Sequence, residues 1–170
     1  MRRFTVIAPL VAALASAGVA QAQPAEVVVA LSPEMQERAV ELGERDVARQ
    51  ADRLARTVDR ALADHPRFQG ASVRLVLKDL EPNRPTFQQV SDRPGLSPIY
   101  SLSIGGASIE GEIVTADGQS HPVRYARYSN TLGEVMGYGT WQDADRAFSR
   151  FASNLAAGRL ESGQRLRSPR

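Results

Sequence analysis

Residues 99–128 contain two runs of alternating apolar and polar side chains, separated by the short sequence Ala-Asp-Gly-Gln. Alternation with a period of two indicates β-strands, and a glycine-bearing turn between two such runs predicts a hairpin. The first strand is expected from Ile99 to Thr115 and the second from His121 to Tyr128. The pairing of these strands decides which side chains can face a core, because a shift of one residue turns a strand over.

A three-residue loop at 116–118 gives this hairpin its better register. It pairs Ile109 with Tyr125 and Glu110 with Arg124, so that apolar residues lie opposite apolar residues and an acid lies opposite a base. A two-residue turn would instead place Glu110 against Tyr125. We therefore expect the longer loop.

The glycines of the first strand, in SIGGASIEGEI, do not complete a catalytic motif. Gly106 and Gly111 have the spacing of a phosphate-binding loop, but Glu112 stands where that loop needs a lysine. Ser108 lacks the second flanking glycine of a nucleophile elbow. The apolar positions change parity at the glycine pair 105–106, where we therefore expect a β-bulge.

Two helices are predicted by apolar residues that recur with a period near 3.6. The first follows a short β-branched strand, begins after the capping residue Ser32 and runs to about Ala63, with Gly43 as a kink or as its true start. The last helix begins near Thr140, which can cap it. Between these helices, the alternating sequence ASVRLVLKDL predicts a further strand.

The resulting order of elements is β-α-β-β-β-α. It predicts an α+β fold, a two-layer sandwich in which a mixed sheet of about four strands carries two helices on one face. A chain of this length can bury a single core without disulfides. We therefore expect one domain over residues 23–160.

The N-terminus has the form of a secretory signal peptide. Arg2 and Arg3 precede an apolar stretch that ends in the small-x-small sequence Ala-Gln-Ala. We expect removal of residues 1–22, before Gln23, over the alternative of a retained membrane anchor. The chain has no cysteine, which closes the route to a lipid anchor and, in an exported protein, indicates the periplasm of a Gram-negative bacterium.

The distribution of charge argues against nucleic acid as a partner. The chain has 21 basic and 19 acidic residues, and loss of Arg2 and Arg3 would balance them. The arginine-rich C-terminal tail, residues 161–170, is expected to be disordered and to make only weak contact with an anionic surface. Recognition of nucleic acid needs a basic face on the folded part, which the composition does not provide.

No catalytic residue, metal site or cofactor is predicted. His65 and His121 stand in turn contexts without the spacing of a ligand pair. Glu110 and Glu112 could resemble a glycosidase pair, but their place opposite Arg124 favours a charge-paired surface. We therefore do not expect an enzyme.

Two irregular segments remain as candidates for a partner-binding site. They are residues 81–98, with four prolines, and residues 130–141, which are rich in glycine. Aromatic and arginine side chains on loops dominate many protein interfaces. The candidate partner-binding residues are Asn83, Arg84, Phe87, Tyr138 and Trp141. The alternative is that Phe87 and Trp141 pack over the sheet edge while the prolines only stiffen the loop.

The combination of a signal peptide with KDLEPNRPTFQQ, IGGASIEGEIVTADGQ and the final DADRAFSRFASNLA resembles a group of uncharacterised secreted proteins of proteobacteria. The order of elements is also similar to the small α/β domain at the N-terminus of TolB and to related envelope lipoproteins, although their cysteine is missing here. This resemblance implies a periplasmic domain that binds other envelope components, and it implies no functional residue. We expect a non-enzymatic binding or adaptor module, with a small-ligand carrier or an unfamiliar hydrolase as the alternative.

Overall fold

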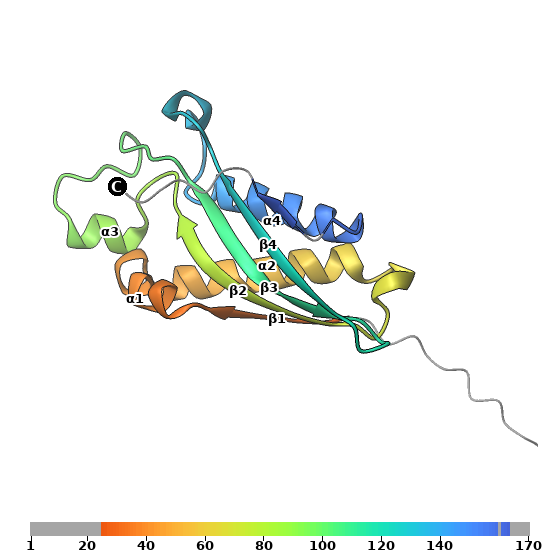
Figure 1. Ribbon diagram of the computed structural model, residues 1–170. Coiled ribbons are helices and arrows are strands. Elements are labelled where there is room, and N and C mark those ends of the chain that lie inside the picture. The colour runs from red at the N-terminus through yellow and green to blue at the C-terminus, as the bar shows by residue number, and fades with distance from the viewer. Residues whose placement is uncertain (1–24, 160, 164–170) are drawn as a thin grey trace, which may run out of the picture.

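The computed structural model describes residues 25–159 and 161–163, with one mixed sheet at the centre of the fold (Figure 1). The strands lie side by side in chain order. They are β1 (Glu26–Leu31), β2 (Ser72–Glu81), β3 (Gly106–Val114), β4 (Ser120–Tyr128) and β5 (Glu161–Gly163). β1 pairs with β2 and β5 with β4 in parallel, whereas β3 is antiparallel to both of its neighbours. Four long strands thus form the sheet, and a short fifth strand extends its edge.

The helices form a second layer. They are α1 (Pro33–Leu42), α2 (Glu44–Leu62), α3 (Phe87–Asp92) and α4 (Gln142–Ala156), with short 3-10 turns η1 (Pro66–Phe68) and η2 (Leu132–Val135). α2 and α4 lie beside each other against one face of the sheet, with α2 over β1 and α4 over β3 and β4 (Figure 1). This arrangement confirms the predicted α+β sandwich with two long helices on one face.

The core lies between these two helices and the sheet. Its fully buried side chains include Leu54 and Leu62 from α2, Phe148 and Phe151 from α4, and Leu75, Leu77, Ile109 and Ile113 from the strands. Burial of each such side chain stabilises the fold by about 1.5–3 kcal/mol relative to exposure. The helical stripes and the strand alternation in the sequence therefore meet in one core.

The chain between β1 and β2 is divided into two helices at Gly43. The Ser32 hydroxyl caps α1 as predicted, by accepting a hydrogen bond of 3.2 Å from the backbone N–H of Met35. Gly43 then has a φ of 94°, in the region that favours glycine, and it both ends α1 and precedes α2. This break turns α2 back across the sheet and leaves α1 at the end of β1 (Figure 1).

The β3–β4 hairpin has the register expected from the three-residue loop. Ile109 lies opposite Tyr125, and both side chains are buried. Glu110 lies opposite Arg124, where their side chains form an ion pair of 3.1 Å on the open face of the sheet. The pairing of apolar with apolar and acid with base was thus a sufficient guide to the register.

The β-bulge predicted at the glycine pair 105–106 is wrong, because β3 begins only at Gly106. The register irregularity lies instead on the neighbouring strand, between Leu77 and Asp79 of β2. It returns Leu80 to the core, where this side chain is fully buried. It also leaves the Asp79 and Glu81 side chains half-exposed. Each carboxylate forms an ion pair of 2.6 Å with the guanidinium of Arg38 on α1.

Two further differences from the sequence-based expectation concern irregular segments. Residues 81–98 contain a helix, α3, that begins in a capping box: Thr86 Oγ1 accepts from the N–H of Gln89 at 3.2 Å, and Gln89 Oε1 accepts from the N–H of Thr86 at 3.1 Å. Residues 161–163 of the predicted tail form β5, because they pair with the edge of β4. The rest of that tail and the predicted signal peptide lie outside the described residues. Among the described helices, none has the length and apolar composition that a membrane span requires.

Replacement of Gly111 by alanine should destabilise the protein. A Cβ atom at this position would lie 2.2 Å from the backbone oxygen of Arg74 and 2.9 Å from Cα of Leu75, so that β2 and β3 would have to separate. We expect a loss of roughly 2–3 kcal/mol in the free energy of unfolding, measured by urea denaturation. Gly139→Ala is the control, because a Cβ there meets no atom within 4 Å. Equal, small losses in both variants would contradict the close approach of β2 to β3.

Candidate functional site

The structure brings the two candidate loops together at one end of the sheet. The backbone N–H of Asn83 donates to the carbonyl of Thr140 at 2.7 Å, and Arg84 Nε donates to the carbonyl of Tyr138 at 2.5 Å. The loops follow the end of β2 and the end of β4, which lie at the same end of the sheet on either side of the start of β3 (Figure 1). We refer to this part of the molecule, residues 82–105 and 129–141, as the loop end.

Asn83 is the buried centre of the loop end and is completely inaccessible to solvent. Its Nδ2 donates to Asp143 Oδ2 at 2.7 Å, and its Oδ1 accepts from the backbone N–H of Asp143 at 2.9 Å. The Ser129 hydroxyl donates to the same carboxylate at 2.6 Å, and Nδ2 lies 3.4 Å from the carbonyl of Ser103. The expectation that Asn83 contacts a partner is therefore wrong: its side chain joins both loops to the first turn of α4.

Arg84 also makes contacts within the molecule. Besides the carbonyl of Tyr138, its guanidinium donates to the carbonyls of Pro98 and Ile99. One half-buried cation thus satisfies three carbonyl groups from two loops. We expect these bonds to hold the loops in place, and the role of Arg84 in binding a partner stays a prediction.

The three aromatic candidates differ in exposure. Phe87, at the start of α3, is 83% exposed, so it does not pack over the sheet edge. Trp141 is half-buried and packs against the core at the start of α4, as the alternative interpretation held. Tyr138 is half-buried, with the guanidinium of Arg146 4.3 Å above its ring and a hydrogen bond from Arg146 to its hydroxyl.

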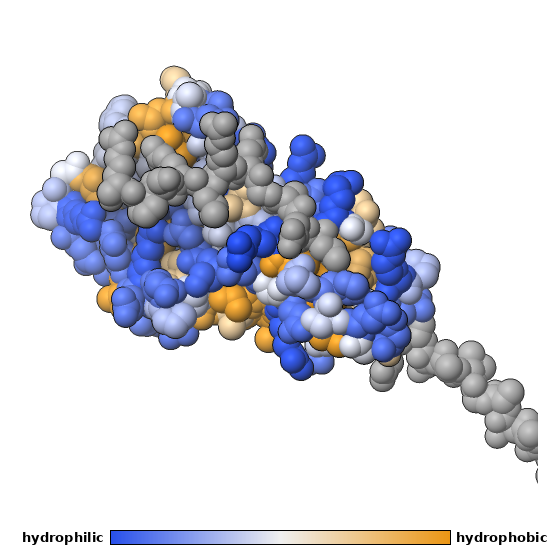
Figure 2. Space-filling view, viewed as in Figure 1, coloured by the Kyte–Doolittle hydropathy of each residue, from blue (hydrophilic) through white to orange (hydrophobic). Residues whose placement is uncertain are grey.

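Further apolar side chains of the loop end are exposed, and the sequence analysis did not single them out. Together with Phe87 they form the loop-end apolar surface: Phe87, Ile99, Tyr100, Leu132 and Met136. Each is more than half exposed, and Tyr100 reaches 85%. Apolar residues are visible at this end in the space-filling view (Figure 2). These residues stand in segments without a helical or strand-like apolar pattern. Large apolar side chains in such segments were the sequence signal that could have identified them.

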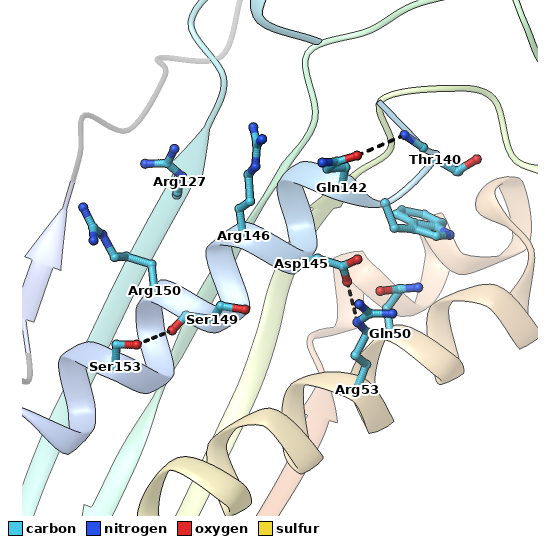
Figure 3. Close-up of a pocket in the computed structure, with 12 residues that line it drawn as sticks. Gln50, Arg53, Arg127, Thr140, Gln142, Asp145, Arg146, Ser149, Arg150 and Ser153 are labelled. Atoms are coloured by element: carbon cyan, nitrogen blue, oxygen red, sulfur yellow. Dashed lines mark hydrogen bonds and ion pairs between the residues drawn. The ribbon is translucent and has the colours of Figure 1, made fainter. Parts of the chain in front are cut away.

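A second surface feature is an open cleft of about 720 Å³ over the outer side of α4 (Figure 3). It reaches α2 on one side and the end of β4 on the other. Four arginines and one carboxylate line it, together with neutral polar residues: Arg53, Arg127, Arg146, Arg150 and Asp145. Arg53 Nε forms an ion pair of 2.6 Å with Asp145. Burial raises the pKa of Asp145 above its usual value, and the charge of Arg53 offsets only part of this rise.

The wall of this cleft also holds a buried amide. Gln50 of α2 is 7% exposed, and its Oε1 accepts no hydrogen bond from any described residue. An unpaired buried acceptor costs about 1–3 kcal/mol, so a native protein rarely keeps one without a reason. Gln50 points towards the cleft beside Arg53 and Asp145 (Figure 3).

These two features expose apolar and cationic groups. In the part of the chain that the structure describes, no group of three or more histidine, cysteine, aspartate or glutamate side chains could hold a metal ion. Asp143, the most buried carboxylate near the cleft, is occupied by hydrogen bonds from Asn83 and Ser129. The exposed groups are apolar side chains at the loop end and guanidinium groups in the cleft, and both types bind partners without bond chemistry.

No model of a known protein family matches the chain, and no curated protein has a significantly similar sequence.

Removal of either member of the buried pair should weaken the loop end. Asn83→Ala leaves the Asp143 carboxylate and backbone N–H with unmet hydrogen bonds, and we expect a loss of about 2–3 kcal/mol in unfolding free energy. Asp143→Ala should cost a similar amount, and the double variant should cost clearly less than the sum of the two. Urea denaturation of the three variants measures this coupling. Strictly additive losses would contradict the account.

Proposed function

We propose that this chain is a non-enzymatic partner-binding module of the bacterial cell envelope, which docks on another protein through the loop-end apolar surface. The observation that carries the proposal is the gathering of large, exposed apolar side chains on two loops that are held by buried polar contacts. Single exposed apolar residues are common on protein surfaces, but several large ones at one end of a molecule are typical of an interaction site. The N-terminal sequence with the form of a signal peptide supports an envelope location.

The bracing of the loops supports binding because it limits the entropy lost on association. Exposed aromatic side chains on a mobile loop would have to be ordered by the partner, at a cost of about 0.5–1.5 kcal/mol for each side chain and more for the backbone. Here Arg84 and Asn83 already fix both loops to the body of the protein. Phe87 is likewise held on a capped helix. The loop-end apolar surface is therefore preorganised for binding.

The charges around this surface favour a protein over an anionic membrane. Arg93, which directly follows α3, forms an ion pair of 2.7 Å with Glu41. Asp92 accepts hydrogen bonds from Gln88, and Glu134 accepts one from the N–H of Asn130. Attraction to anionic lipid needs an excess of free basic side chains beside the apolar ones. The loop-end apolar surface has instead the paired, polar rim that is typical of a protein interface.

Photo-crosslinking residues at the loop end should capture a discrete protein partner in living cells that normally contain this protein. Positions 87 and 100 are the best sites, because their side chains are 83% and 85% exposed. Position 119, exposed near the hairpin turn at the opposite end of the sheet, is the matched control. We expect one adduct of defined mass at Phe87 and Tyr100 and none at Gln119.

With that partner purified, Phe87→Ala and Tyr100→Ala should each weaken binding by about tenfold or more, as interface anchors do. Circular dichroism and urea denaturation should show that neither substitution changes the fold, since both side chains point into solvent. Crosslinking that is absent at both positions, or equal at position 119, would overturn the proposed docking surface.

A further inference from the structure

Three arginines meet at the side of the cleft that faces β4. Arg146 and Arg150 are one turn apart on α4, and Arg127 lies at the end of β4, so the sheet and the helix both contribute. In the close-up Arg146 and Arg150 project from the side of α4 that faces away from the pair formed by Arg53 and Asp145, and Arg127 projects from the neighbouring strand β4 (Figure 3). We call these three residues the arginine cluster.

The arginine cluster is not neutralised within the described part of the chain. The guanidinium groups of Arg127 and Arg150, on β4 and α4, form no ion pair or hydrogen bond with any described residue. The nearest carboxylate of Arg146 is Asp143, at 3.8 Å, and that group already accepts hydrogen bonds from Asn83 and Ser129. Three cations side by side repel one another, and repulsion within a few ångströms is relieved by a bound anion.

Two further residues with polar side chains, Ser149 and Gln50, line the same cleft. Ser149 of α4 is exposed in the cleft, and its hydroxyl makes no hydrogen bond to a described residue. The Gln50 amide in the opposite wall also lacks a partner for its oxygen. The cleft thus offers cations, a hydroxyl and an amide that the protein itself does not use.

We propose that the arginine cluster binds a phosphoryl group, carried by a small molecule or by a lipid headgroup. Each guanidinium presents parallel N–H donors that match two oxygens of a phosphate, and three such groups suit an anion with several oxygens and up to two charges. A carboxylate offers only two oxygens and one charge. The Ser149 hydroxyl supplies another donor, and the Gln50 amide can bond the remainder of the ligand. This site is separate from the loop-end apolar surface, so each can fail without the other.

Inorganic phosphate tests the site directly. We expect phosphate to bind saturably. The binding can be measured from chemical-shift changes of the arginine side chains in a titration at constant ionic strength. The double variant Arg127→Gln, Arg150→Gln should weaken the apparent affinity by about tenfold or more, since hydrogen bonds to charged groups contribute about 1.5–3 kcal/mol each. Arg150→Lys should also weaken it, because lysine keeps the charge but loses the fork.

The matched control is Arg45→Gln, Arg74→Gln, which makes the same change in net charge at exposed positions outside the cleft. Vesicles of phosphatidylcholine with phosphatidylglycerol distinguish the two sources of phosphate. Sedimentation with these vesicles that requires Arg127 and Arg150 would identify a lipid headgroup. Saturation by free phosphate without vesicle binding would identify a soluble phosphorylated molecule. If neither probe binds, or if both double variants lose binding equally, the proposal is overturned.

Discussion

The buried pair of Asn83 and Asp143 is the interaction on which the loop end depends. The side-chain amide of Asn83 makes two hydrogen bonds to Asp143. It donates one to the Asp143 carboxylate and accepts one from the Asp143 backbone N–H. The backbone of Asn83 also donates to Thr140 and accepts from Ser103, so one residue is bonded to two other segments, at 103 and at 140–143, that are far from it in the sequence. A buried carboxylate without partners costs several kcal/mol, and for this reason the pair has to form as a unit. The buried Asn83 side chain also requires glycine at position 105, because a Cβ atom there would lie 2.6 Å from it.

Two surfaces of different chemistry lie on either side of this pair. On the side of α3 and η2, the held loops expose apolar side chains such as Phe87 and Met136. On the side of α4, Asp143 lies in the first turn of the helix, one turn before Arg146, whose guanidinium stacks on Tyr138. The 130–141 loop therefore contributes to both surfaces. A module that binds a protein through one surface and a phosphoryl group through the other would link an envelope protein to a phosphorylated molecule or a lipid headgroup.

Most of the fold could be predicted from the sequence, because hydrophobic periodicity and cross-strand pairing are local. The hairpin register that joins Ile109 to Tyr125 is the clearest case. The bulge in β2 was also visible, since the buried leucines change parity before Leu80, but the glycine pair drew the prediction to the wrong strand. The site was harder to predict, because burial of Asn83 depends on a residue sixty positions away. Likewise, Arg127 joins the arginine cluster only once β4 and α4 have packed together.

Native-state hydrogen exchange of three backbone amides tests the central claim most directly. Asn83, Ser103 and Asp143 each donate a backbone hydrogen bond within the loop end. If the buried pair holds the loops as part of the folded body, these amides should exchange only on global unfolding, with the same free energy as the core amide of Ile109. The account is contradicted if the three amides exchange much faster through local opening while Ile109 stays protected.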